Sequence, residues 1–227
     1  MHYGRYSCLN GSAPNVRYNR GEEGSMARLP LTEPEVSATK LVIKFGKTGL
    51  TDEQFWQLCR DNGDLQMELS AQKELIIMPP VGLKTGWREN ILTTRLTIWA
   101  EKDGTGIVCG PDTLFRLPNT AFRGPDAAWI RKERLEAFTD AELEKFGQFC
   151  PDFVAEIRSP RDTLKELQEK MTEYIANGAQ LGWLIDPYKP AVYIYRPGEP
   201  VKGLENPTSI SGDPVLPGFV FNVAEIL

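Results

Sequence analysis

A strand-like segment with a carboxylate inside it, FVAEI at residues 153–157, sets the strongest limit on how this chain folds. Its apolar residues run together without alternation, which is typical of a strand that is covered on both faces. Burying a charge costs free energy unless a partner compensates it, so Glu156 needs a cation nearby. Arg158 lies two residues on, and its side chain shares the same face of the strand. The sequence alone leaves two partners open for Glu156, Arg158 or a metal ion.

Helix and strand patterns alternate along the rest of the chain. Thr51 and Gln54 form a capping-box pattern at the start of a short helix, and Thr139 and Glu142 offer another. Ser159 or Asp162 would cap the helix that follows FVAEI, and Gly178 would end it. We expect helices at about 52–61, 87–103 and 160–177, a hairpin over 65–80, and strands within 105–117, 124–130, 181–186, 191–198 and 217–227. This order predicts an α/β domain with a mixed sheet flanked by helices.

The start of the chain differs from the remainder. Residues 1–25 are rich in Gly, Asn, Arg and Ser and show no periodicity. We therefore predict a disordered N-terminal tail over residues 1–35, with Met26 as the native start, and a single domain over residues 36–227.

Residue counts exclude several classes of protein. The only histidine is His2, in the predicted tail, which excludes histidine-dependent hydrolases and histidine-ligated zinc enzymes. Hydrolytic chemistry must then use carboxylates, and these select Mg²⁺ or Mn²⁺. No apolar run approaches the roughly 20 residues of a membrane span. The four cysteines have no CxxC spacing, so we expect free thiols and a cytoplasmic protein.

The net charge of −5 and the pI of about 5.2 bear on nucleic-acid binding. Proteins that hold nucleic acids constitutively are usually basic. The charge therefore disfavours tight DNA binding by the free protein. It says less against a nuclease, because the carboxylates of a metal site lower the charge until a cation binds.

Three Pro-Asp pairs supply candidate partners for Glu156, namely Asp112, Asp126 and Asp152. Asp152 lies on the same strand, about 13 Å away along the chain, which is too far to share an ion easily. Asp126 begins the strand-like segment DAAWI, and adjacent strands lie about 4.8 Å apart. If the two segments pair, Asp126 and Glu156 can bind one cation. Asp112 stays open, before what looks like a strand at a sheet edge.

Lys170 is the candidate basic residue on the helix after FVAEI, at the border of its apolar face. A lysine can act as a general base, whereas an arginine does not release its proton near neutral pH. Each candidate also has a structural interpretation. Glu156 and Arg158 would form a simple ion pair, Lys170 would be a surface lysine, and Asp126 a turn residue.

The segments GPDAAWI, PDFVAEIRSPRDTLKELQEKMTEYIANGAQLGWLIDPYKPAVYIYRPG and LPGFVFNVAEIL closely resemble the Uma-two family of bacterial proteins. That family is assigned to the restriction-endonuclease-like PD-(D/E)XK superfamily of nucleases. The resemblance covers about residues 50 to 227. It implies a restriction-endonuclease-like fold, a mixed β-sheet flanked by helices.

The resemblance also implies roles for particular residues. The aspartate of the family's PD pair falls on Asp126 and the strand glutamate on Glu156, whereas Arg158 stands where the superfamily has its lysine. A lysine on the following helix takes over in this family, and Lys170 matches it. The superfamily often adds an acidic residue from its first core helix. Glu89 is the candidate for it, with Lys84 or Asn90 as alternative equivalents.

The implied activity is metal-dependent hydrolysis of DNA phosphodiester bonds. Asp126, Glu156 and a main-chain carbonyl near Ile157 would bind Mg²⁺ or Mn²⁺, Lys170 would orient or deprotonate a water, and Arg158 would stabilise the phosphate. Cutting both strands needs two sites, which favours a homodimer. The competing interpretation is an inactive nuclease fold that serves as a binding or regulatory module, which the acidic pI and the missing superfamily lysine favour.

Overall fold

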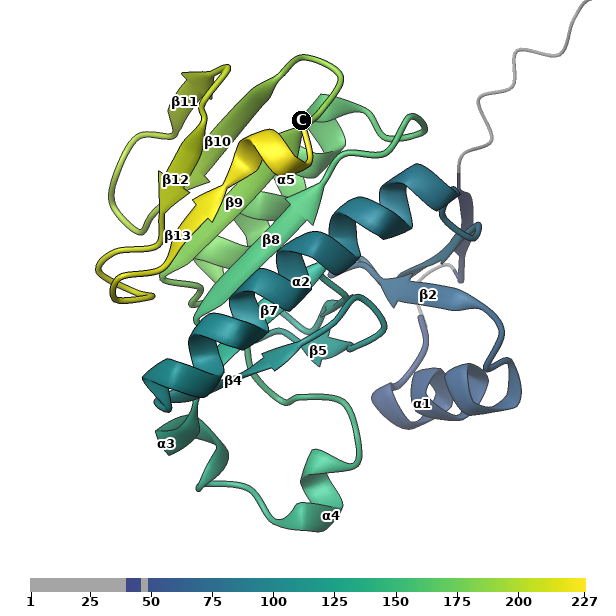
Figure 1. The fold of residues 1–227 in the computed structure, drawn as a ribbon. Coiled ribbons are helices and arrows are strands. Elements are labelled where there is room, and N and C mark those ends of the chain that lie inside the picture. Colours follow the sequence, from purple (N-terminus) through teal and green to yellow (C-terminus); the bar gives the residue numbers. More distant parts are fainter. Residues whose placement is uncertain (1–39, 46–48) are drawn as a thin grey trace, which may run out of the picture. The chain divides into compact units, whose positions relative to one another are not determined.

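The computed structural model describes residues 40–45 and 49–227, which form helices and three β-sheets (Figure 1). The predicted tail over residues 1–35 and the proposed start at Met26 lie outside the described residues. Both stay predictions, as does a single domain over residues 36–227.

The six-stranded sheet is central and mixed, as the element order predicts. Its strand order is β11-β10-β9-β8-β7-β4, and every neighbouring pair is antiparallel except β8 and β9, which are parallel. FVAEI forms β8 in the interior of the sheet, with all five residues buried. The strands are β4 Gly106–Cys109, β7 Ala127–Arg131, β8 Phe153–Ile157, β9 Leu181–Asp186, β10 Ala191–Tyr195 and β11 Lys202–Glu205.

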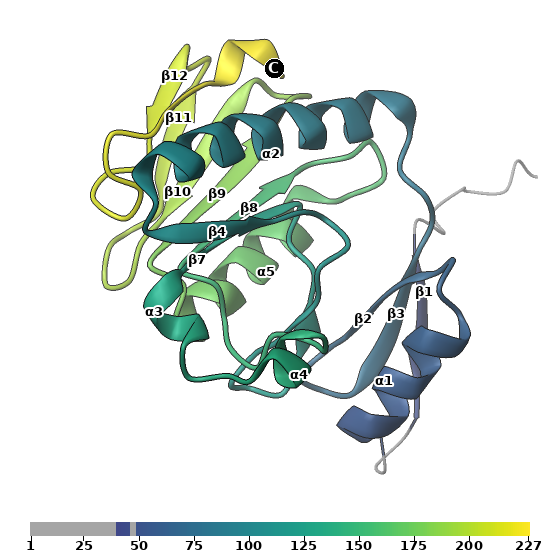
Figure 2. The ribbon, with the colours of Figure 1, turned by 60° about the horizontal axis from the view of Figure 1, so that its bottom comes forward.

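One long helix covers each face of this sheet (Figures 1 and 2). Helix α2, Leu83–Asp103, packs through Leu92 and Leu96 on the face that carries Trp129 and Trp183. Helix α5, Leu164–Ala176, packs on the opposite face, where its apolar residues meet those of β7, β8 and β9. Burial on both faces explains why β8 is apolar throughout, apart from Glu156.

The chain crosses from β8 to its parallel neighbour β9 through α5, because parallel strands need a long connection. The helix begins later than expected. Its N-cap is Thr163, whose side chain accepts a hydrogen bond from the Glu166 amide, so the prediction of Ser159 or Asp162 as the cap is wrong. Asp162 instead accepts from the Ser159 amide and shapes the preceding loop. Gly178 follows the helix with a φ of +115°, as predicted for its end.

A separate five-stranded antiparallel sheet holds the predicted hairpin. Its order is β1-β3-β2-β6-β5, and β2 and β3 pair directly. The strands are β1 Leu41–Lys44, β2 Gln66–Leu69, β3 Glu74–Met78, β5 Phe115–Arg116 and β6 Phe122–Arg123. Helix α1, Asp52–Asp61, has the predicted Thr51–Gln54 capping box and packs here through Phe55. The hairpin thus forms its own small core instead of joining the central sheet.

The remaining elements are short. Thr139 and Glu142 form the predicted capping box at the start of α4, Asp140–Leu143, which follows α3, Lys132–Leu135. A hairpin of β12, Ser209–Ser211, and β13, Val220–Asn222, leads into the 3-10 turn η1, Val223–Glu225. Within the described part of the chain, no helix is long and apolar enough to cross a membrane.

Candidate functional site

Strands β7 and β8 bring two of the predicted carboxylates together. They pair antiparallel with Ala127 opposite Ala155, so Asp126, one residue before β7, lies across from Glu156. The Oδ2 atom of Asp126 accepts a hydrogen bond of 2.6 Å from the backbone amide of Ile157, which is the residue after Glu156. The two segments therefore pair, which is the condition for Asp126 and Glu156 to bind one cation.

Glu156 finds its cation on helix α5. Its side chain is 5 % exposed, and its Oε1 lies 2.8 Å from the Lys170 Nζ. The Tyr174 hydroxyl, one turn further along α5, donates to the same oxygen at 3.2 Å. A surface role for Lys170 does not fit these contacts, since its side chain is only 14 % exposed.

Arg158 takes other partners. Its Nη1 donates to Asp186 at 2.8 Å and its Nε to the Asp162 carbonyl at 3.1 Å. Its side chain keeps 21 % of its surface exposed. Arg158 is thus held at the end of β8 by Asp186, and a contact with phosphate stays a prediction.

The other two Pro-Asp aspartates lie elsewhere. Asp152 is buried at the start of β8, where Arg134 and the Arg131 amide contact it, in keeping with a strand-entry role. Asp112 is exposed in a turn and accepts a hydrogen bond from Gln66.

Glu89 of helix α2 is the third carboxylate of the region. It is buried, whereas Lys84 and Asn90 are exposed. Burial raises the pKa of Glu89, and the negative charge of Glu156 raises it further. The charges of Glu89, Asp126 and Glu156 affect one another's pKa, and this together with its burial makes Glu89 the best placed of the three candidates on this helix.

Burial dominates the protonation of the paired carboxylates. Burial, followed by the charge of Glu89, raises the pKa of Asp126 to about 7. Burial also raises the pKa of Glu156 to about 8, although Lys170 opposes this. Lys170 shows the reverse balance, because burial lowers its pKa but the charges of Glu156 and Glu68 outweigh that effect and raise it. The ammonium of Lys170 therefore stays charged.

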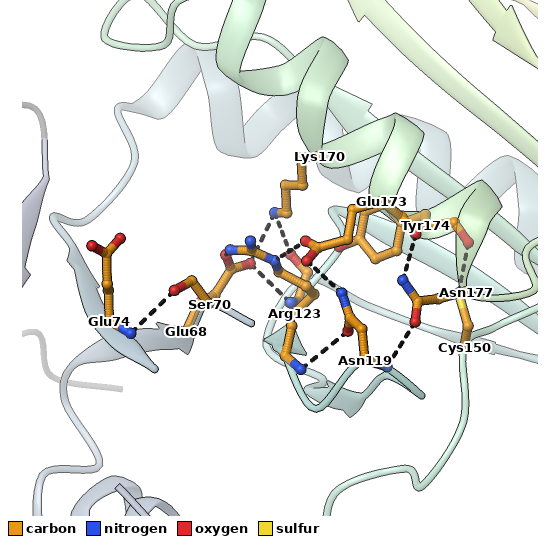
Figure 3. Close-up of polar contacts among 12 residues, drawn as sticks. Glu68, Ser70, Glu74, Asn119, Arg123, Cys150, Lys170, Glu173, Tyr174 and Asn177 are labelled. Atoms are coloured by element: carbon orange, nitrogen blue, oxygen red, sulfur yellow. Dashed lines mark hydrogen bonds and ion pairs between the residues drawn. The ribbon is translucent and has the colours of Figure 1, made fainter. Parts of the chain in front are cut away.

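Glu68 is the residue that sequence reasoning missed (Figure 3). It lies on β2, is 3 % exposed, and its Oε1 lies 2.8 Å from the Lys170 Nζ. Arg123 of β6 contacts both Glu68 and Glu173, at 3.0 and 2.6 Å. A lone glutamate among the apolar residues of QMEL was the available signal, the same kind of signal that singled out Glu156 in FVAEI.

A divalent cation is the group that the sequence predicts here. Among residues 40–45 and 49–227, no group of three or more His, Cys, Asp or Glu side chains is arranged to hold a metal ion. Two carboxylates suffice for Mg²⁺, which usually binds one or two of them and completes its shell with waters and phosphate oxygens. Asp126 and Glu156 offer that set, and their oxygens suit Mg²⁺ or Mn²⁺.

Comparison with known proteins identifies the family. The family model described as "Uma2: Putative restriction endonuclease" matches residues 52–224. The chain belongs to the Uma2 family. The resemblance to Uma-two proteins is thereby confirmed over nearly all of the range expected from the sequence. Comparison with curated proteins found no match.

A solved structure supports the fold. It is described as "a putative nuclease belonging to DUF820" from Anabaena variabilis, and it matches with a TM-score of 0.61 at 16 % identity, over 70 % of this chain and 88 % of that one. The Uma2 chain thus has the predicted restriction-endonuclease-like fold, a mixed sheet flanked by helices.

Proposed function

We propose that this Uma2 protein is a metal-dependent endonuclease that hydrolyses DNA phosphodiester bonds at Asp126 and Glu156. The observation that carries the proposal is the pair of carboxylates on adjacent strands, with the ammonium of Lys170 held against one of them. The description of the family as an endonuclease supports the same activity.

Asp126, Glu156 and the main-chain carbonyl of Ile157 would hold Mg²⁺ or Mn²⁺. When bound, such an ion polarises the phosphate and lowers the pKa of a water molecule. The Ile157 amide fixes one oxygen of Asp126, which orients that carboxylate relative to Glu156. Glu89, buried beside them, would add negative charge that favours cation binding.

Lys170 would act as a fixed positive charge. The two roles considered for it are to orient a water or to deprotonate it. Its raised pKa favours the first, because a charged ammonium has no lone pair to accept a proton. It would orient Glu156 and stabilise negative charge that develops on the phosphate. Arg158, partly exposed at the end of β8, would add a second positive charge for the phosphate.

DNA cleavage tests the proposal directly. Wild type, Asp126→Ala and the exposed control Asp64→Ala are compared on single- and double-stranded DNA with Mn²⁺ or Mg²⁺. We expect wild type and Asp64→Ala to cleave, and Asp126→Ala to be slower by about 1,000-fold, because metal-held charge stabilisation is worth several kcal/mol. A homodimer has two sites and would cut both strands. Light scattering would show the dimer, and double-strand breaks in the DNA would show the paired cuts.

Equal cleavage by wild type and Asp126→Ala would place the active site elsewhere. A wild type that cleaves neither substrate with either metal would favour an inactive binding or regulatory module. The acidic net charge of −5 and Arg158 at the superfamily's lysine position are the features in favour of that module.

A further inference from the structure

We infer that Glu68 is a positioning residue of this site, which holds the ammonium of Lys170 in place between the two sheets. The inference rests on the proposed function and deepens it. Glu68 belongs to the five-stranded sheet, and Lys170 to the helix that covers the central sheet. The hairpin of β2 and β3 therefore contributes a side chain to a site that otherwise belongs to β7, β8 and the two long helices.

The carboxylate of Glu68 is held by three donors. Its Oε1 accepts from the Lys170 Nζ at 2.8 Å and from the Gly124 amide at 2.9 Å, and its Oε2 accepts from Arg123 at 3.0 Å. Two of these donors are cations, and hydrogen bonds between charged groups are the strong ones. Lys170 and Arg123 lower the pKa of Glu68 to about 2, against the effect of burial. Glu68 is thus a fixed negative charge.

The ammonium of Lys170 is matched by three acceptors. They are Glu68 Oε1 at 2.8 Å, Glu156 Oε1 at 2.8 Å and the Gly124 carbonyl at 3.1 Å. An ammonium has three N–H donors, so these contacts use all of them. Lysine has a flexible four-carbon stem, and it keeps one position only where such contacts hold it.

These contacts close a ring through Gly124. Its amide donates to Glu68, its carbonyl accepts from Lys170, and Lys170 donates to Glu68. Gly124 lies two residues before Asp126. Glu68 therefore fixes the position of the Lys170 ammonium, which contacts Glu156, and also that of the backbone at Gly124, which leads into Asp126.

Substitution of Glu173 is a matched control, because it shows the effect of losing a partly buried carboxylate of the same network whose described contacts do not include Lys170. It belongs to the same network and pairs with the same Arg123, at 2.6 Å, and its other oxygen accepts from Asn119 at 2.8 Å (Figure 3). Glu68→Gln and Glu173→Gln each remove one negative charge beside Arg123. Only the first removes the charge of a carboxylate that contacts Lys170, because glutamine leaves a neutral amide oxygen as the acceptor.

The first readout is the reactivity of Lys170, which does not depend on nuclease activity. The full-length variants are treated with acetic anhydride, and acetylation of Lys170 is measured by mass spectrometry relative to Lys165, an exposed lysine of the same helix. We expect Lys170 to react about tenfold faster in Glu68→Gln than in wild type, because a neutral amide oxygen holds an ammonium less strongly than a carboxylate does. Glu173→Gln should match wild type.

The second readout is Mn²⁺-dependent DNA cleavage. We expect Glu68→Gln to lower kcat by about 10- to 100-fold with KM unchanged, because a displacement of about 1 Å in a catalytic group has effects of this size. Glu173→Gln should keep kcat within about twofold of wild type. Glu68→Asp keeps the charge and should recover part of kcat, and it replaces Glu68→Gln if that variant does not fold.

Two results would overturn the inference. One is a Lys170 that stays as protected in the Glu68 variants as in wild type. The other is an equal fall in kcat for Glu68→Gln and Glu173→Gln. Such a result would mean that both substitutions lower kcat by destabilising the fold, and not by displacing Lys170. A wild type without cleavage would contradict the proposed function, and acetylation alone would then decide whether Glu68 holds Lys170.

Discussion

Glu156 has Lys170 and Tyr174 as its described partners, and this makes its charge depend on a single cation. Glu68 differs, because Arg123 and the Gly124 amide would remain if Lys170 were lost. Removing one member of a buried ion pair leaves an uncompensated charge, which is more costly than removing both members.

Substitution of Lys170 therefore has a predictable effect on stability. We expect Lys170→Met to lower the free energy of unfolding by about 3 kcal/mol at pH 8, measured by urea denaturation. Adding Glu156→Gln to Lys170→Met should restore part of that loss. Without Lys170, folding requires Glu156 either to stay charged without a cation or to take up a proton, and glutamine requires neither. Lys165→Met, on the exposed side of the same helix, should change stability by less than about 0.5 kcal/mol. A double variant that is less stable than Lys170→Met would contradict this account.

The residues of the site differ in how far the sequence reveals them. Asp126 directly precedes β7, and Glu156 and Lys170 lie on β8 and α5, elements whose existence and order follow from the sequence pattern. The pattern made the pairing of the two strand segments a possibility, and the structure shows it. The place of Glu68 was not predictable, because its contact with Lys170 depends on where a second sheet packs against the first. The pairing of Arg158 with Asp186 was not predictable either, because it joins the ends of two parallel strands that are separated along the chain by helix α5.

At the scale of elements, helix α5 is the main contributor to the site, since it carries Lys170 and Tyr174, which both contact Glu156. Local signals predicted its end but not its start, because three residues that can cap a helix, Ser159, Asp162 and Thr163, occur close together. Thr163 is the N-cap because the loop uses the side chains of the other two, each of which accepts from a nearby loop amide. The hairpin of β2 and β3 was predictable, whereas its place in a separate sheet depends on packing with Phe55 of the preceding helix α1 and with Phe122 of β6, which is distant in sequence.

The N-cap yields a prediction for the element as a whole. Thr163→Ala removes the acceptor of the Glu166 amide. We expect a loss of about 1 kcal/mol, which corresponds to a fall in Tm of about 2–4 °C for a domain of this size. Thr172→Ala, an exposed position in the interior of the same helix, should leave Tm unchanged or raise it slightly, because alanine favours helix. Thermal unfolding followed by circular dichroism compares the two, and equal effects would argue against Thr163 as the cap.

At the scale of the whole molecule, buried carboxylates of two kinds set the response of stability to pH. The pKa of Glu68 is lowered to about 2, so its contribution to stability is lost only as the pH falls from about 4 towards 2. Asp126 and Glu156 have raised pKa values, about 7 and about 8. The folded state therefore keeps protons on them at pH values where unfolded carboxyl groups have released theirs, and this difference reverses the sign of their contribution.

Because the folded state binds more protons over this range, the free energy of unfolding falls as the pH rises from about 5 to about 8. One pH unit of difference between folded and unfolded pKa is worth about 1.4 kcal/mol, so we expect the Tm of the metal-free protein to fall by at least about 3–6 °C. The double variant Asp126→Asn/Glu156→Gln should lose most of this slope.

Mn²⁺ should raise the Tm of wild type at pH 8 more than at pH 5, since it favours the charged carboxylates and competes with protons for them. Calorimetric melting in EDTA and in Mn²⁺ measures both effects, and an identical slope in the double variant would show that other groups govern the pH response.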